Sequence, residues 1–560
     1  MGYLSWVVPI PVIVPLFAAG LALALWKHGR LQGVISLVAL SVSLVASVTL
    51  LVAADDGPLV LDVGGWATPV GIGLVADRLS TLMLSVSFAV TLCVLVYSLA
   101  QGLEDDDAET PVAIFHPTYL VLTAGVADAF LSGDLFNLFV GFEILLAASY
   151  VLITLGGTGE RVRAGTIYVV VSLLSSLLFL TAIAMTYAAT GTVNLAQLAL
   201  RLGDLDPGVQ LTLQVMLLLA FGIKAAIFPL SAWLPDSYPT APAPVTAVFA
   251  GLLTKVGVYA IIRTQTLLFP DGRLDEVLMI AALATMLVGI LGAVAQNDIK
   301  RLVSFTLVSH IGFMLFGIAL SSEAGLGAAI FYVAHHITVQ TALFLVVGLV
   351  ERHGGTTSLD GLGALAKGAP LLAILFFVPA MNLAGIPPFS GFLGKVGLFE
   401  AGIADGGPLA YVLVAGGAVT SLLTLYALVK AWNKAFWQPA KTAEGDAAPT
   451  SGADAAPAGP TQDGTTQDGT TTAATAVLTR TPQRLPAAMV VSTTVLVSFG
   501  IGLAVVAGPL FGYTDRAAEL LRDRTQYIVS VLPDGERGEG QSAEIAGTDG
   551  DSAVTEVEEP

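Results

Sequence analysis

Long, uncharged apolar stretches recur along the whole sequence, and they restrict the fold to one that a membrane can hold. About fourteen of them reach the roughly 20 residues that an α-helix needs to cross the hydrocarbon core of a bilayer. Mean hydropathy is +0.82 and only 12% of the residues are charged, too few for the surface of a water-soluble protein. Since unpaired backbone groups are costly in lipid, we predict an all-α membrane protein.

The predicted spans follow one another with mostly short connections. Polar residues, glycine or proline mark the ends of each span. The spans are Leu4–Trp26, Leu31–Ala54, Leu79–Ala100, Phe115–Leu131, Leu135–Leu155, Thr166–Ala189, Val209–Leu230, Ala243–Phe269, Leu274–Ala295, Leu302–Leu320, Leu326–Val350, Leu371–Phe399, Leu409–Ala431 and Ala487–Phe511.

Basic residues in the short loops predict the orientation, because cytoplasmic loops of membrane proteins are enriched in Lys and Arg. Most of them follow the odd-numbered spans, which places both termini outside the cytoplasmic membrane. The residues that set this orientation are Lys27, Arg30, Arg161, Arg163, Lys300, Arg301, Arg352, Lys367, Lys430 and Lys434, against Arg201, Arg263 and Arg273 on the other side.

The spans group into regions of different composition. The loop Asp55–Arg78 has an alternation of Val, Leu and Gly that predicts a small hairpin outside the membrane. A segment rich in Ala, Thr, Gly, Pro and Asp, with the direct repeat QDGTTQDGTT, predicts a flexible cytoplasmic linker. The regions are 1–114 for the first spans, 115–269 and 270–433 for two five-helix units, 434–486 for the linker, 487–511 for the last span and 512–560 for an acidic tail.

Acidic residues outnumber basic ones and gather outside the spans. The sequence has 42 Asp and Glu against 24 Lys and Arg, a formal net charge of −18. Five acids lie between Glu104 and Glu109, and others end the chain. Two hypotheses fit this pattern: a prokaryotic cell adapted to high salt, or acidic disordered loops without further meaning.

Four charged residues lie in the middle of long apolar runs: Glu143, Lys224, Lys255 and Lys395. A charge near the bilayer centre costs at least about 2.5–3.5 kcal/mol, so such residues indicate function. At roughly 4 Å and an effective dielectric near 20, Glu143 and Lys224 would attract each other by about 4 kcal/mol. That energy allows a switch in which protonation of Glu143 releases the lysine proton. The alternative is a static buried ion pair.

Prolines beside two of these lysines predict helices that are broken at membrane depth. Pro229 follows Lys224, and Pro387 with Pro388 precedes Lys395. Proline removes a backbone donor, and broken helices in transporters expose backbone groups to water-lined cavities. The alternative is ordinary proline kinking. Two breaks in separate halves of the chain favour a repeated unit.

Three histidines in spans are candidates for proton relay, because histidine titrates near neutrality. His335 and His336 are adjacent, so at most one of them should face a given path; His310 is a third candidate. Each has a simple alternative as a neutral, hydrogen-bonded histidine. Asp134 and Glu400 lie near the span ends and are weaker candidates for guiding cations or releasing protons. We predict no metal site, no cofactor and no nucleic-acid binding.

Four long segments resemble the antiporter-like membrane subunits, a family that covers Mrp-type cation/proton antiporters and the proton-pumping subunits of respiratory complex I and membrane hydrogenases. The Mrp-type members look most similar. The resemblance reaches to about residue 431 and includes the last span. The segments are GDLFNLFVGFEILLAASYVLITLGG, FGIKAAIFPLSAWLPDSYPTAPAPVTAVFAGLLTKVGVYAIIR, NDIKRLVSFTLVSHIGFMLFGIAL and GIPPFSGFLGKVGLFEA.

The resemblance implies two inverted five-helix repeats, each with a half-channel at its broken helix. It also implies that Glu143 and Lys224 are the carboxylate–lysine pair, Lys255 the central lysine and Lys395 the outlet lysine. The relay histidine falls on His335 or His336. One departure is Gln340, where relatives commonly carry a lysine.

We therefore predict a proton-conducting core subunit of a hetero-oligomeric antiporter that exchanges protons for Na⁺ or K⁺ in the cytoplasmic membrane. Other antiporter subunits and the lipid bilayer would be its partners. One alternative is a proton-pumping subunit of a redox complex, the only case in which the chain would belong to an enzyme of the NADH:quinone oxidoreductase type. Another is a scaffold subunit that conducts nothing.

Overall fold

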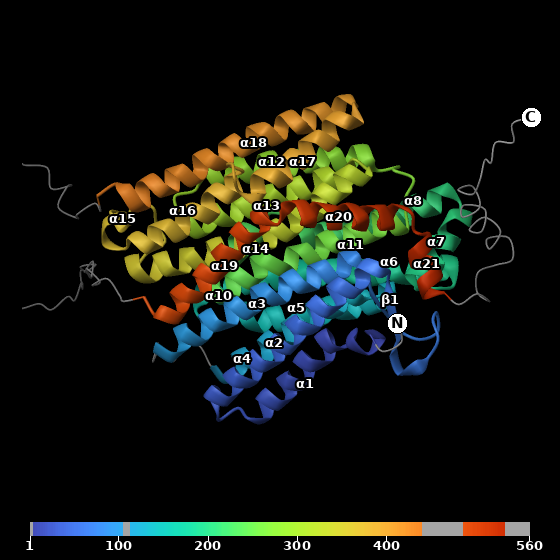
Figure 1. Cartoon of the computed structure of the whole chain (residues 1–560), viewed down its shortest axis with the longest axis horizontal. Coiled ribbons are helices and arrows are strands. Elements are labelled where there is room, and N and C mark those ends of the chain that lie inside the picture. The colour runs from blue at the N-terminus through green and yellow to red at the C-terminus, as the bar shows by residue number, and fades with distance from the viewer. Residues whose placement is uncertain (1–3, 105–111, 440–484, 533–560) are drawn as a thin grey trace, which may run out of the picture.

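A computed structural model describes residues 4–104, 112–439 and 485–532. In these ranges thirteen helices are long and apolar enough to cross a membrane. They pack as one elongated bundle, with α15 (Leu365–Gly368) at one end (Figure 1). The short helices α7 (Leu195–Arg201) and α21 (Thr525–Val531) lie at the other end, together with β1 (Leu59–Asp62). The all-α multi-span architecture is confirmed.

The remaining elements follow the predicted spans closely. The N-terminal part contains η1 (Leu4–Val7), α1 (Ile10–Ala24), α2 (Gly29–Ala53), η2 (Ala54–Asp56), η3 (Val63–Gly65), β2 (Gly73–Ala76) and α3 (Arg78–Glu104). The first repeat contains α4 (Val112–Leu131), α5 (Leu135–Ile153), α6 (Gly159–Thr190), η4 (Leu202–Asp204), α8 (Pro207–Ala225), α9 (Trp233–Ser237), η5 (Tyr238–Thr240), α10 (Ala243–Val248), η6 (Phe249–Leu253) and α11 (Thr254–Leu267). The second repeat and C-terminal part contain α12 (Asp275–Ala295), α13 (Ile299–Ala319), α14 (Glu323–Gly354), α16 (Pro370–Ala384), α17 (Ser390–Asp405), α18 (Pro408–Trp432), η7 (Asn433–Trp437), α19 (Ala487–Val505) and α20 (Ala507–Arg522).

Two five-helix repeats form the centre of the bundle. An odd number of crossings brings the chain to the opposite side, so the second repeat starts from the other face and is inverted. Equivalent contacts support this relation. Asp134 caps α5 and forms a β-bridge with Asn194, and Asp298 caps α13 and forms a β-bridge with Ser358.

The third helix of each repeat shows the same correspondence. Both α6 and α14 contain 32 residues. Each begins at a hydroxyl N-cap, Thr158 or Ser322, and each ends at a left-handed glycine, Gly191 or Gly355. Hydroxyl N-caps and glycine C-caps are the usual helix end signals, so the local sequence sets the same length twice.

When α6 and α14 are aligned at these N-caps, each position of α6 has an equivalent position in α14. Ser172 of α6 then corresponds to His336 of α14, and Ser176 corresponds to Gln340. The two repeats therefore share a backbone but differ in the polar side chains at mid-membrane.

The fourth helix of each repeat is interrupted. α8 ends at Ala225 and α9 begins only at Trp233, with Pro229 between them. α16 ends at Ala384 and α17 begins at Ser390, so the predicted span Leu371–Phe399 is two helices with Pro387 and Pro388 between them. In each case the residue after the first half has a positive φ, +59° at Ala226 and +86° at Gly385.

α14 is among the most enclosed of the described helices. It is buried along nearly its whole length and packs against α3, α10, η6, α13, α16, α17, α19 and α20. Side chains on α14 therefore lie where the two repeats and the C-terminal helices meet.

One boundary was wrong. Residues 512–532, assigned to the acidic tail, instead complete α20 and form α21. They carry an apolar face, with Leu520, Leu521 and Ile528 buried, that α14 and α7 cover. The acidic loop 105–109, most of the linker 434–486 and the tail beyond residue 532 lie outside the described residues.

A two-stranded antiparallel hairpin lies in the loop between α2 and α3. β1 pairs with β2 from Leu59 with Ala76 to Asp62 with Gly73. Directly after β2, Asp77 forms an ion pair of 2.6 Å with Arg263 of α11, and both side chains are almost fully buried. Burial raises the pKa of Asp77, but Arg263 and hydrogen bonds from Ser80 outweigh it and hold the pKa below its ordinary value.

We expect Arg263→Met to destabilise the protein strongly, because it leaves a buried carboxylate without its partner. Breaking such a pair costs about 3–5 kcal/mol, whereas replacing both partners is often nearly neutral. In the double variant Asp77→Asn/Arg263→Met, asparagine keeps the hydrogen bond to the Ser80 backbone. Thermal unfolding of the purified protein should show a large drop in Tm for the single variant and partial recovery for the double. Equal drops in both would contradict a stabilising buried pair.

Candidate functional site

Glu143 and Lys224 approach the same helix from two sides. Lys224, near the end of α8, donates from Nζ to the backbone oxygen of Ser172 on α6 at 3.0 Å. Glu143, on α5, accepts a hydrogen bond at Oε1 from the hydroxyl of Ser176, also on α6. The direct contact expected between Glu143 and Lys224 is therefore wrong: no ion pair within 4.0 Å joins them in the described structure.

One turn of α6 separates the two groups. Ser172 and Ser176 are four residues apart, which is about 5–6 Å along a helix. The serine hydroxyl can both donate and accept. The geometry thus replaces an ion pair by a carboxylate–hydroxyl contact and an ammonium–carbonyl contact on one helix face.

A small cavity lies beside Lys224. It has a volume of about 10 Å³, and its lining includes Ser172, Tyr238 and Leu253. A cavity of this volume can hold about one water molecule, which needs at least two polar partners. Lys224 and the buried hydroxyl of Tyr238, which has no hydrogen-bond partner among the described protein atoms, supply them. Leu253, in the lining of this cavity, lies two residues before Lys255.

Lys255 is completely buried and is held by the backbone. Its Nζ donates to the carbonyl oxygen of Ala250 at 2.6 Å. Ala250 lies in η6, a single π-helical turn between α10 and α11. Such turns are rare and occur often at functional sites. No ion pair of the described residues includes Lys255.

The three histidines lie on or beside α14. Tyr332 of α14 contacts His310, and Ser390 of α17 contacts His335. The hydroxyl of Tyr332 lies 2.6 Å from Nδ1 of His310, and the hydroxyl of Ser390 lies 2.9 Å from Nδ1 of His335. His335 and His336 do face different neighbours: His335 faces α17, while the ring of His336 lies 5.3 Å from that of His310.

His336 is the most unusual of the three. It is fully buried, and neither ring nitrogen has a hydrogen-bond partner among the described protein atoms. Nε2 of His310 and Nε2 of His335 are in the same condition. An unsatisfied buried polar atom costs about 1–3 kcal/mol, so water is the natural partner for these nitrogens.

Lys395 returns from α17 to the broken end of α16. Its Nζ donates to the carbonyl oxygens of Leu383 and Ala384 at 3.1 and 3.0 Å. These carbonyls end a helix and so carry partial negative charge. Its Nζ also lies 4.8 Å from the ring centre of Phe313, a cation–π contact. Matching the two breaks puts Leu383 at the position of Lys224, so each repeat brings one ammonium group to its break.

The remaining candidates have simpler surroundings. Asp134 is buried and accepts from the Asn137 backbone as the N-cap of α5. Glu400 is exposed on α17. Gln340 donates to the carbonyl oxygen of Val303 at 2.8 Å, and its own side-chain oxygen has no protein partner in the described structure. No group of three or more potential metal ligands occurs in the ranges that the structure describes.

Sequence reasoning missed the hydroxyls of Ser176, Tyr332 and Ser390 and the backbone carbonyl of Ser172, which complete the site. Serine and tyrosine occur throughout the spans, so their identity alone carries no signal. The matched end signals of α6 and α14 could have shown that Ser172 and His336 occupy equivalent positions in the two repeats.

The chain is similar to known membrane proteins along most of its length. Residues 132–424 match the family described as NADH:quinone oxidoreductase/Mrp antiporter, TM. The chain is 38% identical over 527 residues to a Na⁺/H⁺ antiporter subunit of Alkalihalophilus pseudofirmus, and the match covers 93% of this chain and 98% of that protein.

Two solved structures show how far the similarity extends. A chain in the structure of the Mrp complex from Dietzia sp. DQ12-45-1b superposes with a TM-score of 0.84 at 36% identity, covering 95% of this chain and all of that one. A chain of respiratory complex I from Thermus thermophilus gives a TM-score of 0.75 at 21% identity, covering 92% and 99%. The second likeness concerns the fold alone.

Gly385→Ala should displace Lys395. A Cβ at Gly385 would lie 2.9 Å from Cδ and 3.2 Å from Nζ of Lys395, besides the strain of φ +86°. Gly406→Ala is the matched control, because Gly406 has φ +73° and nothing within 4 Å of its Cβ position. Both changes carry a left-handed penalty of about 1–2 kcal/mol.

Beyond this penalty, Gly385→Ala should lower the free energy of unfolding by a further amount of about 1–3 kcal/mol, which is typical of overpacking. Thermal unfolding should show this as a larger drop in Tm than for Gly406→Ala. It should shrink when Lys395→Ala is added to Gly385→Ala. Equal effects of the two glycine substitutions would show that Lys395 does not occupy this place.

Proposed function

We propose that this chain, which belongs to the NADH:quinone oxidoreductase/Mrp antiporter transmembrane family, is the proton-conducting core subunit of a multisubunit Na⁺/H⁺ antiporter. The observation that carries the proposal is the partner of each buried lysine. Lys224, Lys255 and Lys395 all donate to backbone carbonyls rather than to carboxylates. A neutral amine keeps two N–H donors, so each lysine can release a proton and retain its hydrogen bond.

The first repeat exchanges protons across one turn of α6. Glu143 takes up a proton, and the Ser176 hydroxyl that bonds it can turn from donor to acceptor. A neutral Glu143 then supports the charge on Lys224 less, so the lysine passes its proton toward the cavity beside Tyr238. Protonation of Glu143 thus drives release of the proton from Lys224.

The centre and the second repeat continue the path. Lys255 receives the proton and passes it through water to His336, whose ring nitrogens have no partner among the described protein atoms. His310 with Tyr332, and His335 with Ser390, provide further donor and acceptor groups on the way to Lys395. At the break of α16, Lys395 releases the proton.

The exchange needs a driving force and a second ion. Inward proton flow releases about 2.3 kcal/mol per charge for each 100 mV of membrane potential. This energy expels Na⁺ or K⁺ through this subunit or a neighbour in the complex. The other antiporter subunits are therefore the chain's partners.

A redox-driven proton pump is the second candidate, because the complex I chain has the same fold. The greater identity to antiporter chains, 38% and 36%, favours exchange over redox pumping. A non-conducting scaffold is the third candidate, and substitution of Lys224 separates it from the others.

The orientation and the salt adaptation belong to this proposal as well. We place both termini outside the cytoplasmic membrane, since the basic residues near α15 then face the cytoplasm. The acidic composition, with a formal net charge of −18, favours a halophilic source.

Lys224→Ala should abolish sodium-dependent proton exchange, because it removes the group that couples Glu143 to the centre. Inverted membrane vesicles that contain the whole assembly, with a pH-sensitive dye, measure this exchange. Lys367→Ala is the matched control, since Lys367 is exposed on α15, and it should retain full exchange. Unchanged exchange with Lys224→Ala, in an assembly that still forms, would favour the scaffold.

Thiol labelling tests the orientation, and the single cysteine, Cys93, makes it practicable. In a Cys93→Ala background, Asp204→Cys at the α7 end should react with a membrane-impermeant maleimide added to intact cells. Lys367→Cys, on α15 at the opposite end, should react only after the membrane is opened. The reverse pattern would place both termini in the cytoplasm.

A further inference from the structure

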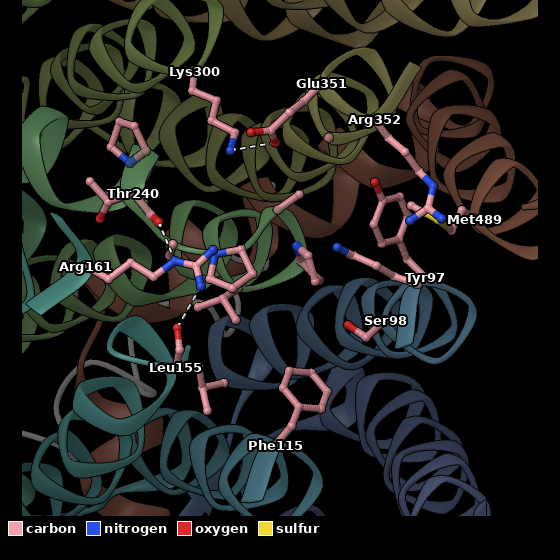
Figure 2. Close-up of a pocket in the computed structure, with 18 of the residues that line it drawn as sticks. Tyr97, Ser98, Phe115, Leu155, Arg161, Thr240, Lys300, Glu351, Arg352 and Met489 are labelled. Carbon is pink, nitrogen blue, oxygen red and sulfur yellow. Dashed lines mark hydrogen bonds and ion pairs between the residues drawn. The ribbon is translucent and has the colours of Figure 1, made fainter. Parts of the chain in front are cut away.

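A large cavity opens at the end of the bundle that we place in the cytoplasm. It measures about 1830 Å³ and lies between the N-terminal helices α2, α3 and α4 and the ends of α6, α13 and α14. Figure 2 shows Arg161 reaching in from one wall, with Lys300 and Glu351 on another and Ser98 and Phe115 opposite. We propose that this cavity binds the phosphate headgroup of an anionic phospholipid.

The charges of the lining favour an anion. Five cationic side chains and three carboxylates line it, so the formal charge of the lining is positive; Lys300 is paired with Glu351, and Arg301 with Asp236 outside the cavity. The cationic side chains are Arg30, Arg161, Lys300, Arg301 and Arg352, and the carboxylates are Glu160, Asp298 and Glu351.

Arg161 is the strongest anion-binding group in the cavity. Its guanidinium donates to the backbone oxygens of Thr240 and Leu155 at 3.2 and 3.0 Å, which fixes it in place. It takes part in no ion pair of the described residues, and three of its five N–H donors remain for a ligand. Arginine with several free donors matches the oxygens of a phosphate.

Backbone and hydroxyl donors add to this. The N-terminal turns of α2, α6 and α13 line the cavity, and helix N-termini carry partial positive charge. The hydroxyl of Ser98 also lines it, buried and without a hydrogen-bond partner among the described protein atoms. These donors line the same cavity as Arg161.

The cavity continues from a polar mouth into apolar depth, as a lipid requires. On α2 its lining runs from Arg30 through Val34 to Leu37, about 10 Å along one helix face. Leu99 and Phe115 line the facing helices α3 and α4. When a headgroup binds at Arg30 and Arg161, the acyl chains of the lipid can therefore lie against these apolar side chains. Basic pockets between helices on the cytoplasmic side are known to bind anionic headgroups.

Native mass spectrometry of the purified assembly tests the proposal, with phosphatidylglycerol, phosphatidylcholine and inorganic phosphate as probes. We expect phosphatidylglycerol to bind, and phosphatidylcholine and inorganic phosphate to bind much less. Arg161→Gln should weaken phosphatidylglycerol binding about tenfold or more, the effect of losing one charge-assisted contact. Arg163→Gln is the matched control, two residues along α6 and outside the lining, and it should bind as the unchanged protein does.

Arg161 also joins two backbone segments, so its substitution could unfold the protein. A second pair of variants separates loss of binding from loss of folding. Arg30 is exposed and makes no ion pair or side-chain hydrogen bond with another described residue. Arg30→Gln should weaken binding as well, whereas Lys27→Gln, outside the lining, should not. Unchanged binding in both Arg161→Gln and Arg30→Gln would overturn the proposal. So would equally tight binding of inorganic phosphate, or a neighbouring subunit that fills the cavity in a map of the assembly.

Discussion

The contact between a buried lysine and a backbone carbonyl is the interaction on which the rest of the site depends. Lys300 shows the alternative: it is paired with Glu351 at 2.7 Å, and removing its proton would leave a carboxylate without its counter-charge. Lys224, Lys255 and Lys395 have neutral partners instead. Gaining or losing a proton changes the charge at these positions without breaking their hydrogen bonds. Buried lysines on carbonyls therefore suit transfer, whereas the paired lysine suits stability.

For Lys255 and Lys395 the fold supplies those carbonyls where a helix is irregular or interrupted, whereas Ser172, which accepts from Lys224, lies within the continuous helix α6. An unbroken helix uses nearly all of its carbonyls internally, but the last four of a helix remain available. The break after α16 presents Leu383 and Ala384 to Lys395, and the π-helical turn η6 presents Ala250 to Lys255. Because the repeats are inverted, one break serves each side of the membrane. α14 lies between them and carries His335 and His336, which would join the two halves.

Apolar length predicted nearly all of the helices, and proline predicted both breaks. The charged residues in the spans were equally visible, because their cost in lipid sets them apart. The sequence did not reveal that the Ser172 carbonyl holds Lys224 and the Ser176 hydroxyl holds Glu143, since serine in a span carries no comparable cost. It also failed at residues 512–532, where the amphipathic α20 and α21 are too polar and short to read as spans but bury leucines against α14 and α7.

Water positions in the intact assembly test the central claim most directly. A cryo-EM map at a resolution that shows ordered water should contain solvent in the cavity beside Lys224 and within hydrogen-bond distance of both ring nitrogens of His336. Such density would join the lysines and histidines into one chain. A map in which apolar side chains seal Lys224, Lys255, His336 and Lys395 from one another, with no ordered solvent between them, would contradict the account.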